Sequence, residues 1–341
     1  MRAFITGLSG PTLTTAERRF VAEADPWGLI LFKRNVTTPE ALRRLVGEFR
    51  AVLGRQAPVL VDQEGGRVQR LGPPLWQSYP PGAAYGSAFD RDPNGGLRAA
   101  RLGARLIASD LTEVGIDVDC APVADVPAAG ADPVIGDRAY GTDPAKVAAL
   151  AGAFASGLMD GGVLPVLKHL PGHGRATADS HQSLPVVAAD WRTLDASDFA
   201  AFRPLSGLPL GMTAHIVFSA IDPVAPATTS ANIVKHVIRD SIGFSGLLMS
   251  DDISMGALSG SLSERSQAAI AAGCDVVLHC NGVLPEMAEV AAVVPALAGE
   301  AARRAEAALA VRKPEAPLDV AASRAELAKL LHDFRPGTAM A

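Results

Sequence analysis

The sequence has few of the features that mark secreted or membrane proteins. It has 3 cysteines in 341 residues, Cys120, Cys274 and Cys280, and no C-x-x-C spacing. An odd number of scattered cysteines argues against a disulfide framework, so we expect buried, reduced thiols. No apolar run reaches the roughly 18 residues of a membrane span, and the segment MRAFITGLSG lacks a cleavage site. We therefore expect a cytoplasmic protein that does not enter a membrane and whose first residues form a strand.

Basic runs and nucleotide-binding motifs are also missing. The formal net charge is -5, and no cluster of lysine and arginine suits the phosphates of a nucleic acid. The glycine-rich segments TGLSGPT and GGRVQRLG match neither G-x-G-x-x-G nor a P-loop, and no G-x-S-x-G nucleophile motif occurs. We therefore predict no nucleic-acid partner, no cofactor and no serine nucleophile.

The histidines do not form a recognised metal motif. His169 and His173 are four residues apart, but a proline and a glycine between them prevent the helical face of H-E-x-x-H. A metal-dependent hydrolase that uses His169, His181, His215 and a carboxylate is an alternative. We predict that no metal is bound.

What the sequence does contain is an alternation of apolar runs and helical patterns. Eight runs recur along the chain: RAFITGL, WGLILF, APVLVDQE, GIDVDCAPV, VLPVLKH, LGMTAHIVF, GLLMSDD and CDVVLHC. Most are too continuous for half-exposed strands and fit strands buried on both faces. Helical patterns lie between several of them, for example at 38–54, 98–115, 143–162 and 263–273. In the first, Thr38 suits an N-cap, Pro39 the first helical position and Gly54 the residue beyond the end.

This order of elements predicts an α/β fold with a single (β/α)8 barrel over residues 1–341. The residues after about 313 are expected to form a helical tail, with a helix near SRAELAKLLHDF. A doubly wound open sheet is the alternative.

Polar residues directly follow the apolar segments VLV, VLPVL, GMTA and GLLMS of four of these runs. They are Asp62 and Glu64, Lys168 and His169, His215, and Asp251 and Asp252. In a barrel the carboxyl ends of the strands converge on one mouth, where the active site lies. A polar group on an apolar strand is costly unless it is hydrogen-bonded or functional, so the repetition favours a site.

Carboxylates at a barrel mouth suit glycoside hydrolysis, in which one carboxylate is the nucleophile and a second group protonates the leaving oxygen. Either Asp251 or Asp252 fits the nucleophile. Adjacent strand residues face opposite ways, so only one of the two can point at the centre of the pocket, and the pattern does not decide which.

Several motifs, taken together, resemble a known family. KHLPGHG followed by ADSH, with VDQEGGRVQRL upstream and SDDISM downstream, resembles glycoside hydrolase family 3, and GLILFKRN and VIGDRAYG match the same pattern. More narrowly, the chain resembles the short, single-domain bacterial β-N-acetylglucosaminidases of peptidoglycan recycling, from about residue 1 to 300. Larger members carry a second domain with a glutamate acid/base, for which this chain is too short.

The resemblance implies a role for individual residues. Asp251 is the expected nucleophile, and His181 is the expected acid/base, held in one tautomer by Asp179. The expected sugar contacts are Asp62, Arg70, Arg138, Lys168 and His169. His173, Glu64 and Arg67 are expected to brace the site, Asp252 takes a supporting role, and the role of His215 stays open.

The predicted function is that of a retaining exo-β-N-acetylglucosaminidase, a β-N-acetylhexosaminidase. The resemblance implies that it releases N-acetylglucosamine from a β-1,4 linkage to anhydro-N-acetylmuramic acid, with or without a peptide. A phosphorylase that uses phosphate in place of water is one alternative, and a sugar-binding barrel without turnover is another. We expect a monomer whose only partner is its saccharide substrate.

Overall fold

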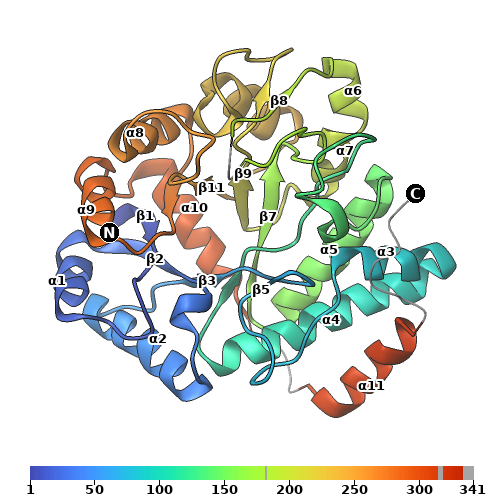
Figure 1. Ribbon diagram of the computed structural model, residues 1–341, viewed down its shortest axis with the longest axis horizontal. Coiled ribbons are helices and arrows are strands. Elements are labelled where there is room, and N and C mark those ends of the chain that lie inside the picture. The colour runs from blue at the N-terminus through green and yellow to red at the C-terminus, as the bar shows by residue number, and fades with distance from the viewer. Residues whose placement is uncertain (181–182, 314–317, 333–341) are drawn as a thin grey trace.

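The computed structural model describes residues 1–180, 183–313 and 318–332. Eight parallel strands close into a barrel in the order β1-β12-β11-β9-β7-β6-β3-β2 (Figure 1). They are β1 (Arg2–Thr6), β2 (Pro26–Leu31), β3 (Val59–Val61), β6 (Val118–Asp119), β7 (Leu164–Leu170), β9 (Leu210–Thr213), β11 (Leu247–Asp252) and β12 (Val276–His279). Each overlaps one of the eight apolar runs, so the predicted barrel is confirmed and the open-sheet alternative is wrong.

Helices surround the barrel. The α-helices are α1 (Thr15–Ala24), α2 (Pro39–Leu53), α3 (Gly82–Arg91), α4 (Pro93–Glu113), α5 (Pro144–Asp160), α6 (Trp191–Ala196), α7 (Asp198–Phe202), α8 (Leu262–Ala272), α9 (Leu284–Val293), α10 (Gly299–Ala310) and α11 (Val320–Leu330). Shorter helices are η1 (Lys33–Asn35), η2 (Gly136–Arg138), η3 (Arg203–Leu205) and η4 (Ala227–Thr229), and η5 (Ile233–Ser241) is a π-helix. Two small sheets at the loops pair β4 (Gln63–Gly65) with β5 (Val68–Gln69), and β8 (Val186–Val187) with β10 (Val217–Phe218).

Helix α2 shows how local sequence sets these elements. The Thr38 side chain accepts a hydrogen bond from the Ala41 N–H at 3.2 Å, and Gly54 ends the helix with a φ of 64°. A left-handed residue of this kind costs little when it is glycine. Leu42, Leu45 and Phe49 are buried at the helical spacing, so one face packs on the barrel. The boundaries predicted from the sequence are confirmed.

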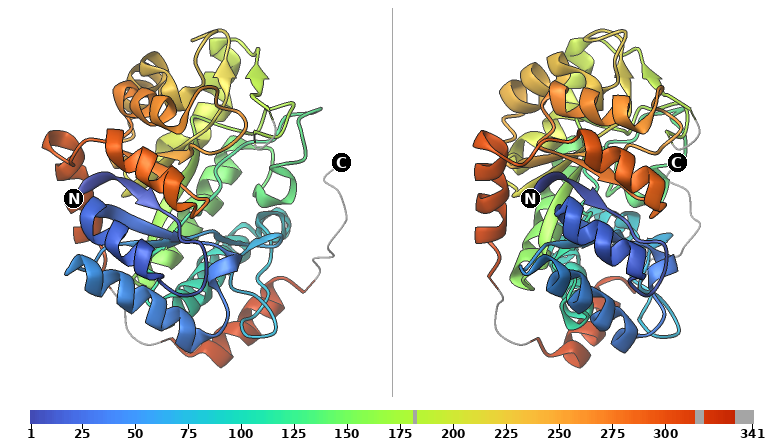
Figure 2. Two further views of the ribbon diagram at one scale, coloured as in Figure 1. Left: turned by 60° about the vertical axis from the view of Figure 1, so that its left-hand side comes forward. Right: turned by 90° about the vertical axis from the view of Figure 1, so that its left-hand side faces the viewer.

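The strands are apolar throughout because both of their faces are buried. Alternate side chains such as Leu60, Val118 and Leu247 fill the barrel, and their neighbours pack against the helices. Helix α10 crosses the end of the barrel opposite the mouth, where its Ala305 and Ala308 pack with the interior cluster (Figure 2). Cys120, Cys274 and Cys280 are free and buried, as expected.

Helix α11 lies beside α4 although about 200 residues separate the two in sequence (Figure 1). Arg324 lies 3.5 Å from Asp110, the Arg91 guanidinium donates to the Leu330 carbonyl at 3.2 Å, and Leu327 is buried. The predicted helix after residue 313 therefore exists and packs on the barrel.

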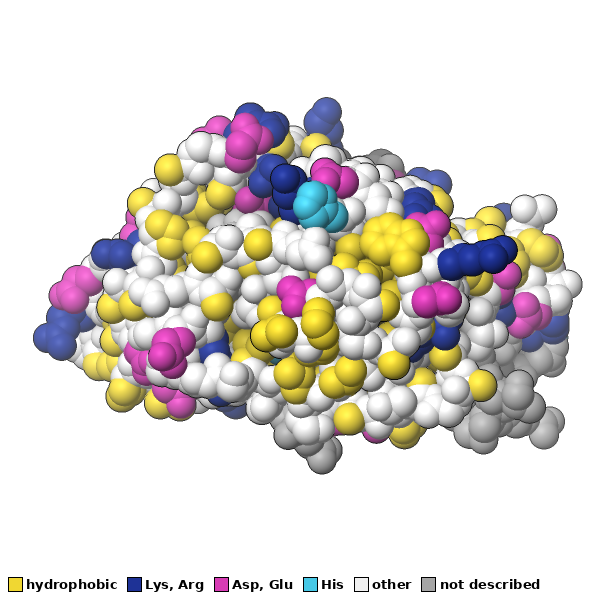
Figure 3. All heavy atoms as spheres, turned by 90° about the horizontal axis from the view of Figure 1, so that it is seen from above, with side chains coloured by type: hydrophobic (Ala, Val, Ile, Leu, Met, Phe, Trp, Pro, Cys, Tyr) yellow, Lys and Arg dark blue, Asp and Glu magenta, His cyan; other side chains and the backbone are white. Residues whose placement is uncertain are grey.

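The surface carries charges of both signs. Seen from above, basic and acidic side chains are interspersed among apolar ones on this face, with no continuous basic area (Figure 3). Among the residues that the structure describes, none of the helices combines the length and the apolar character needed to cross a membrane.

Candidate active site

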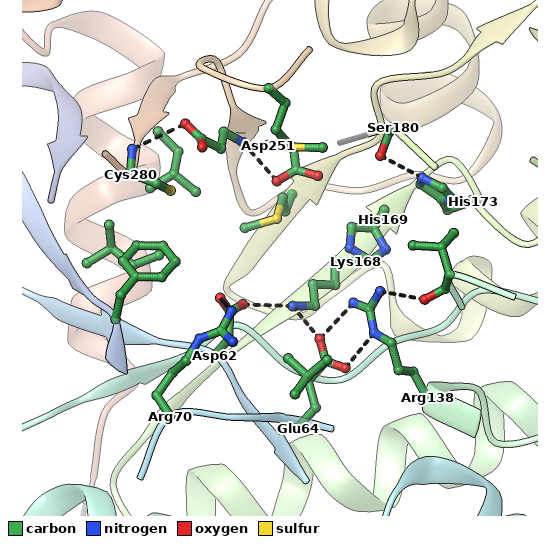
Figure 4. A pocket seen from close by; sticks show the side chains of 18 of the residues that line it. Asp62, Glu64, Arg70, Arg138, Lys168, His169, His173, Ser180, Asp251 and Cys280 are labelled. Carbon is green, nitrogen blue, oxygen red and sulfur yellow. Dashed lines mark hydrogen bonds and ion pairs between the residues drawn. The ribbon is translucent and has the colours of Figure 1, made fainter. Parts of the chain in front are cut away.

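A pocket of about 450 Å³ opens where the strands end at the mouth of the barrel. The predicted residues Asp62, Arg70, Arg138, Lys168, His169, Asp179 and Asp251 all line it. Figure 4 shows Asp251 on one side of the pocket and Asp62, Arg70 and Glu64 across from it. His181, the predicted acid/base, lies outside the described residues, so its place in the site stays a prediction.

A buried network of charges forms one wall of the pocket (Figure 4). The Lys168 ammonium lies 3.0 Å from an Asp62 carboxylate oxygen and 2.7 Å from a Glu64 oxygen. Arg70 donates to the other Asp62 oxygen at 2.9 Å, and Arg138 donates to both Glu64 oxygens at 2.8 Å. Bidentate arginine–carboxylate pairs of this kind fix geometry as well as charge.

Burial raises the pKa values of these carboxyls, but the neighbouring cations outweigh that effect. Lys168 and Arg70 hold the pKa of Asp62 well below its usual range, and Arg138 and Lys168 lower the pKa of Glu64 to about 2. The two carboxylates in turn raise the pKa of Lys168 against the effect of its burial. The wall therefore presents charged donors and acceptors that are fixed in place before any ligand binds.

His169 is held by an aspartate that the sequence reasoning did not single out. The Nδ1 of His169 lies 2.7 Å from Asp125, and the same carboxylate accepts the His173 main-chain N–H at 2.6 Å. Burial opposes ionisation of Asp125, but His169 and the His173 N–H lower its pKa to about 2. Because an ionised carboxylate only accepts, Nδ1 donates, and Asp125 thereby sets the orientation of the ring.

The neighbours Asp251 and Asp252 differ in what their carboxylates do. Asp252 accepts from the Ser254 hydroxyl at 2.6 Å, the Ser254 N–H at 3.1 Å and the Cys280 N–H at 3.2 Å, so it holds the loop after β11. Asp251 accepts the Asp252 N–H at 2.8 Å. Burial opposes its ionisation, but His215, His169, that N–H and Lys168 together lower its pKa. Asp251 is therefore an ionised carboxylate at neutral pH.

His215 braces this strand end. Its Nε2 donates to the Asp252 carbonyl at 2.9 Å, and its Nδ1 lies 2.7 Å from the Thr228 hydroxyl. With both ring nitrogens engaged, His215 has no atom to offer to a metal, which argues against the metal-ligand alternative. Within residues 1–180, 183–313 and 318–332, no three histidine, cysteine, aspartate or glutamate side chains are grouped as metal ligands.

The segment that carries Asp179 is tied down on both sides. The His173 Nε2 lies 3.1 Å from the Ser180 hydroxyl, and both side chains are buried. Burial and then His169 lower the pKa of His173 to about 4, so this ring is neutral. Arg175 donates to Asp198 and to the Ser197 hydroxyl at 2.6 Å, which anchors the segment to α7. These contacts agree with a bracing role for His173.

Glu64 and Arg67 also make bracing contacts. Glu64 is the shared acceptor of Lys168 and Arg138, whereas Arg67 is half-exposed and donates to Asp137 at 3.3 Å and to the Pro133 carbonyl at 3.2 Å. Arg67 thus ties the β4–β5 turn to the segment that carries Arg138.

An ionised carboxylate that faces a wall of fixed charges at a barrel mouth is the arrangement of a carbohydrate-active enzyme. Residues 7–312 match the model of the glycosyl hydrolase family 3 N terminal domain, and the chain belongs to this family.

Relatives of known name agree with this assignment. The chain is similar to a protein named Beta-hexosaminidase from Alkalilimnicola ehrlichii, with 41% identity over 281 residues, which cover 81% of this chain and 79% of that protein. It is also similar to a crystal structure of NagZ from Neisseria gonorrhoeae in complex with N-trifluoroacetyl-D-glucosamine. The TM-score is 0.85 and the identity 32%, with 97% of this chain and 98% of that chain covered. A NagZ structure from the same organism in complex with zinc ion has a TM-score of 0.84, also at 32% identity, with the same coverage of both chains. The protein is therefore a glycoside hydrolase of the β-hexosaminidase type.

Proposed function

We propose that the protein is a retaining exo-β-N-acetylglucosaminidase that acts in cytoplasmic peptidoglycan recycling. The proposed substrate is N-acetylglucosamine in a β-1,4 linkage to anhydro-N-acetylmuramic acid, with or without its peptide. The observation that carries the proposal is the ionised Asp251 carboxylate across the pocket from the Asp62, Glu64 and Lys168 network. The sugar ligand in the NagZ complex supports the choice of N-acetylglucosamine.

The proposed reaction has two steps. Asp251 attacks the anomeric carbon while His181 protonates the departing oxygen, which yields a covalent glycosyl-enzyme and the free leaving sugar. His181 then takes a proton from water as the water attacks the same carbon, and Asp251 leaves. Asp179, which lines the pocket, holds the imidazole of His181 in its working tautomer.

The charged wall holds the sugar in place during both steps. Asp62, Arg70, Arg138, Lys168 and His169 supply the contacts to sugar hydroxyls in this proposal. Their mutual ion pairs fix them before substrate arrives, so little reorganisation is needed on binding. Removal of a single sugar from a chain end is part of this proposal.

Release of a coloured phenol from an aryl N-acetyl-β-glucosaminide, with Asp251→Ala as the control, tests this proposal. We expect the wild type to turn over and the variant to lose nearly all activity. A protein that binds N-acetylglucosamine but releases no phenol would be a sugar-binding barrel instead. Parallel reactions with and without phosphate identify a phosphorylase, because only that enzyme forms a sugar 1-phosphate.

A further inference from the structure

Gln63 lies between two pocket carboxylates and does not itself line the pocket. Asp62 and Glu64 face the cavity, while Gln63 is fully buried in the hairpin formed by β4 and β5. Neighbouring residues in extended backbone point to opposite sides, which accounts for this division. A buried amide in this position must find partners or destabilise the fold.

The Gln63 side chain finds its partners at the main chain of Arg70 and Leu71. Its oxygen accepts the Arg70 N–H at 2.9 Å and the Leu71 N–H at 3.0 Å, and its NH2 group donates to the Leu71 carbonyl at 2.8 Å. The Arg70 guanidinium returns to Asp62, the residue before Gln63, at 2.9 Å. The Gln63 amide therefore fixes the backbone of Arg70, whose side chain is a predicted sugar contact.

The main-chain N–H of Gln63 is held in its turn by Asp119, at the end of β6. An Asp119 carboxyl oxygen accepts this N–H at 2.9 Å, just beyond the point where Val61 pairs with Asp119 in the parallel ladder. Asp119 is fully buried, and among the described residues its second oxygen has no hydrogen-bond partner. The Asp119 carboxyl therefore extends the pairing of β3 with β6 as far as Gln63.

We infer that Gln63 and Asp119 are positioning residues. They set the geometry of the Asp62–Arg70 ion pair in the charged wall of the pocket. The inference rests on the proposed function, in which Arg70 contacts the sugar. Neither residue lines the pocket, so Gln63 acts through Arg70, whose backbone it holds, and Asp119 acts through the Gln63 main chain. Loss of either should weaken sugar binding in the ground state and in the transition state alike, which raises KM more than it changes kcat.

Asp119→Asn and Asp119→Ala form a matched pair of tests. Asparagine keeps an acceptor for the Gln63 N–H, whereas alanine leaves that buried N–H without a partner. We expect Asp119→Asn to stay within about threefold of wild-type KM on an aryl N-acetyl-β-glucosaminide and Asp119→Ala to raise KM on the order of tenfold. Equal KM values for the two folded variants would overturn the role given to Asp119.

A double-mutant cycle tests Gln63, with folding of each variant checked by thermal unfolding. Gln63→Met keeps the length of the side chain but removes its hydrogen bonds, and we expect KM to rise on the order of tenfold with kcat within about threefold. Because Gln63 acts through Arg70, adding Gln63→Met to Arg70→Ala should change KM by less than about twofold. The inference would be overturned if the KM increases of the two single variants multiplied in the double variant. It would also be overturned if KM were unchanged in Gln63→Met while Arg70→Ala was impaired. An unaffected Arg70→Ala would instead contradict the sugar contact in the proposed function.

Discussion

At the scale of single residues, the ionisation of Asp251 depends on a balance between its burial and the charged side chains around it. Burial disfavours its ionised form, while His215, His169 and Lys168 favour it, and the net effect lowers its pKa. A nucleophile must be ionised. A carboxylate acid/base close by would repel its negative charge and raise its pKa. A histidine as the partner removes this repulsion, which fits the proposed pairing of Asp251 with His181.

Replacement of His181 tests the acid/base assignment through the leaving group. A nitrophenolate leaves readily without a proton, whereas a sugar alkoxide does not. His181→Ala should therefore lose on the order of 10²- to 10⁴-fold in kcat/KM on the natural disaccharide and clearly less on an activated aryl glycoside. Asp251→Ala should be nearly inactive on both. If His181→Ala lost the same factor in kcat/KM on both substrates, His181 would be a positioning residue and another residue would be the acid.

Asp119 gives a prediction about stability and pH. Burial, together with Asp62 and Glu64, raises its pKa from 3.8 to about 8, although the Gln63 N–H and Lys168 act the other way. The charge of Asp119 also acts on the buried Cys120 and Tyr140. Between about pH 4 and 8 the folded state therefore keeps a proton that the unfolded state has lost, so this residue lowers stability as pH rises. Asparagine does not titrate. The Tm of Asp119→Asn minus that of the wild type should grow from pH 4 to 8 in thermal melts, and a constant difference would contradict the neutral carboxyl.

The residues that sequence reasoning missed act across long separations. Asp125 contacts His169 over 44 positions, and Asp119 contacts Gln63 over 56. Asp119 lies within the apolar run GIDVDCAPV and Asp125 just after it, but their partners depend on the register of that strand with β3 and β7, which no local pattern encodes. The pocket residues Asp62, Lys168 and Asp251 were accessible from the sequence because each comes directly after a continuous apolar segment, at or near the carboxyl end of a buried strand.

At the scale of elements, the strands were predictable because each is apolar on both faces, and α2 because its caps are explicit. The π-helix η5 was not predicted, since the pattern of IVKHVIRDS suggests no departure from ordinary helical bonding. The apolar face of η5 is buried against the rest of the fold, and Arg239 on this helix donates to Asp275 at 2.9 Å, just before β12. Arg304 of α10 donates to the same carboxylate at 2.9 Å, and so does the Leu248 N–H.

Asp275→Ala should destabilise the fold without touching the active site. The substitution removes a carboxylate that pairs with two largely buried arginines and accepts a main-chain N–H, although Arg239 keeps the Phe244 and Gly246 carbonyls, and we expect a cost of about 3 kcal/mol. We expect a lower Tm together with wild-type kcat/KM below the transition, because Asp275 lies at the end of the barrel opposite the mouth. The control is Glu23→Ala, which removes an exposed 4.0 Å pair with Arg19 and should leave Tm unchanged. Similar shifts in the two variants would show that the Asp275 cluster adds no stability.

At the scale of the whole molecule, the pocket that the structure describes is built within one chain. Its lining comes from the carboxyl ends of β2, β7, β9, β11 and β12 and from the segments that follow β2, β3, β6, β7, β11 and β12, so no second copy is needed to complete the described part. We predict a monomer. Light scattering during size-exclusion chromatography should give 35.2 kDa at assay concentrations. A stable dimer whose dissociation abolishes activity would contradict this prediction.

The central claim is that Asp251 attacks the sugar and forms a covalent intermediate, and the anomeric form of the first product tests it most directly. Two displacements at one carbon restore the original configuration, whereas one displacement by water inverts it. Proton NMR during early hydrolysis of an aryl N-acetyl-β-glucosaminide, before mutarotation, distinguishes the two. The account predicts that β-N-acetylglucosamine is formed first. Early appearance of the α-anomer would contradict Asp251 as the nucleophile.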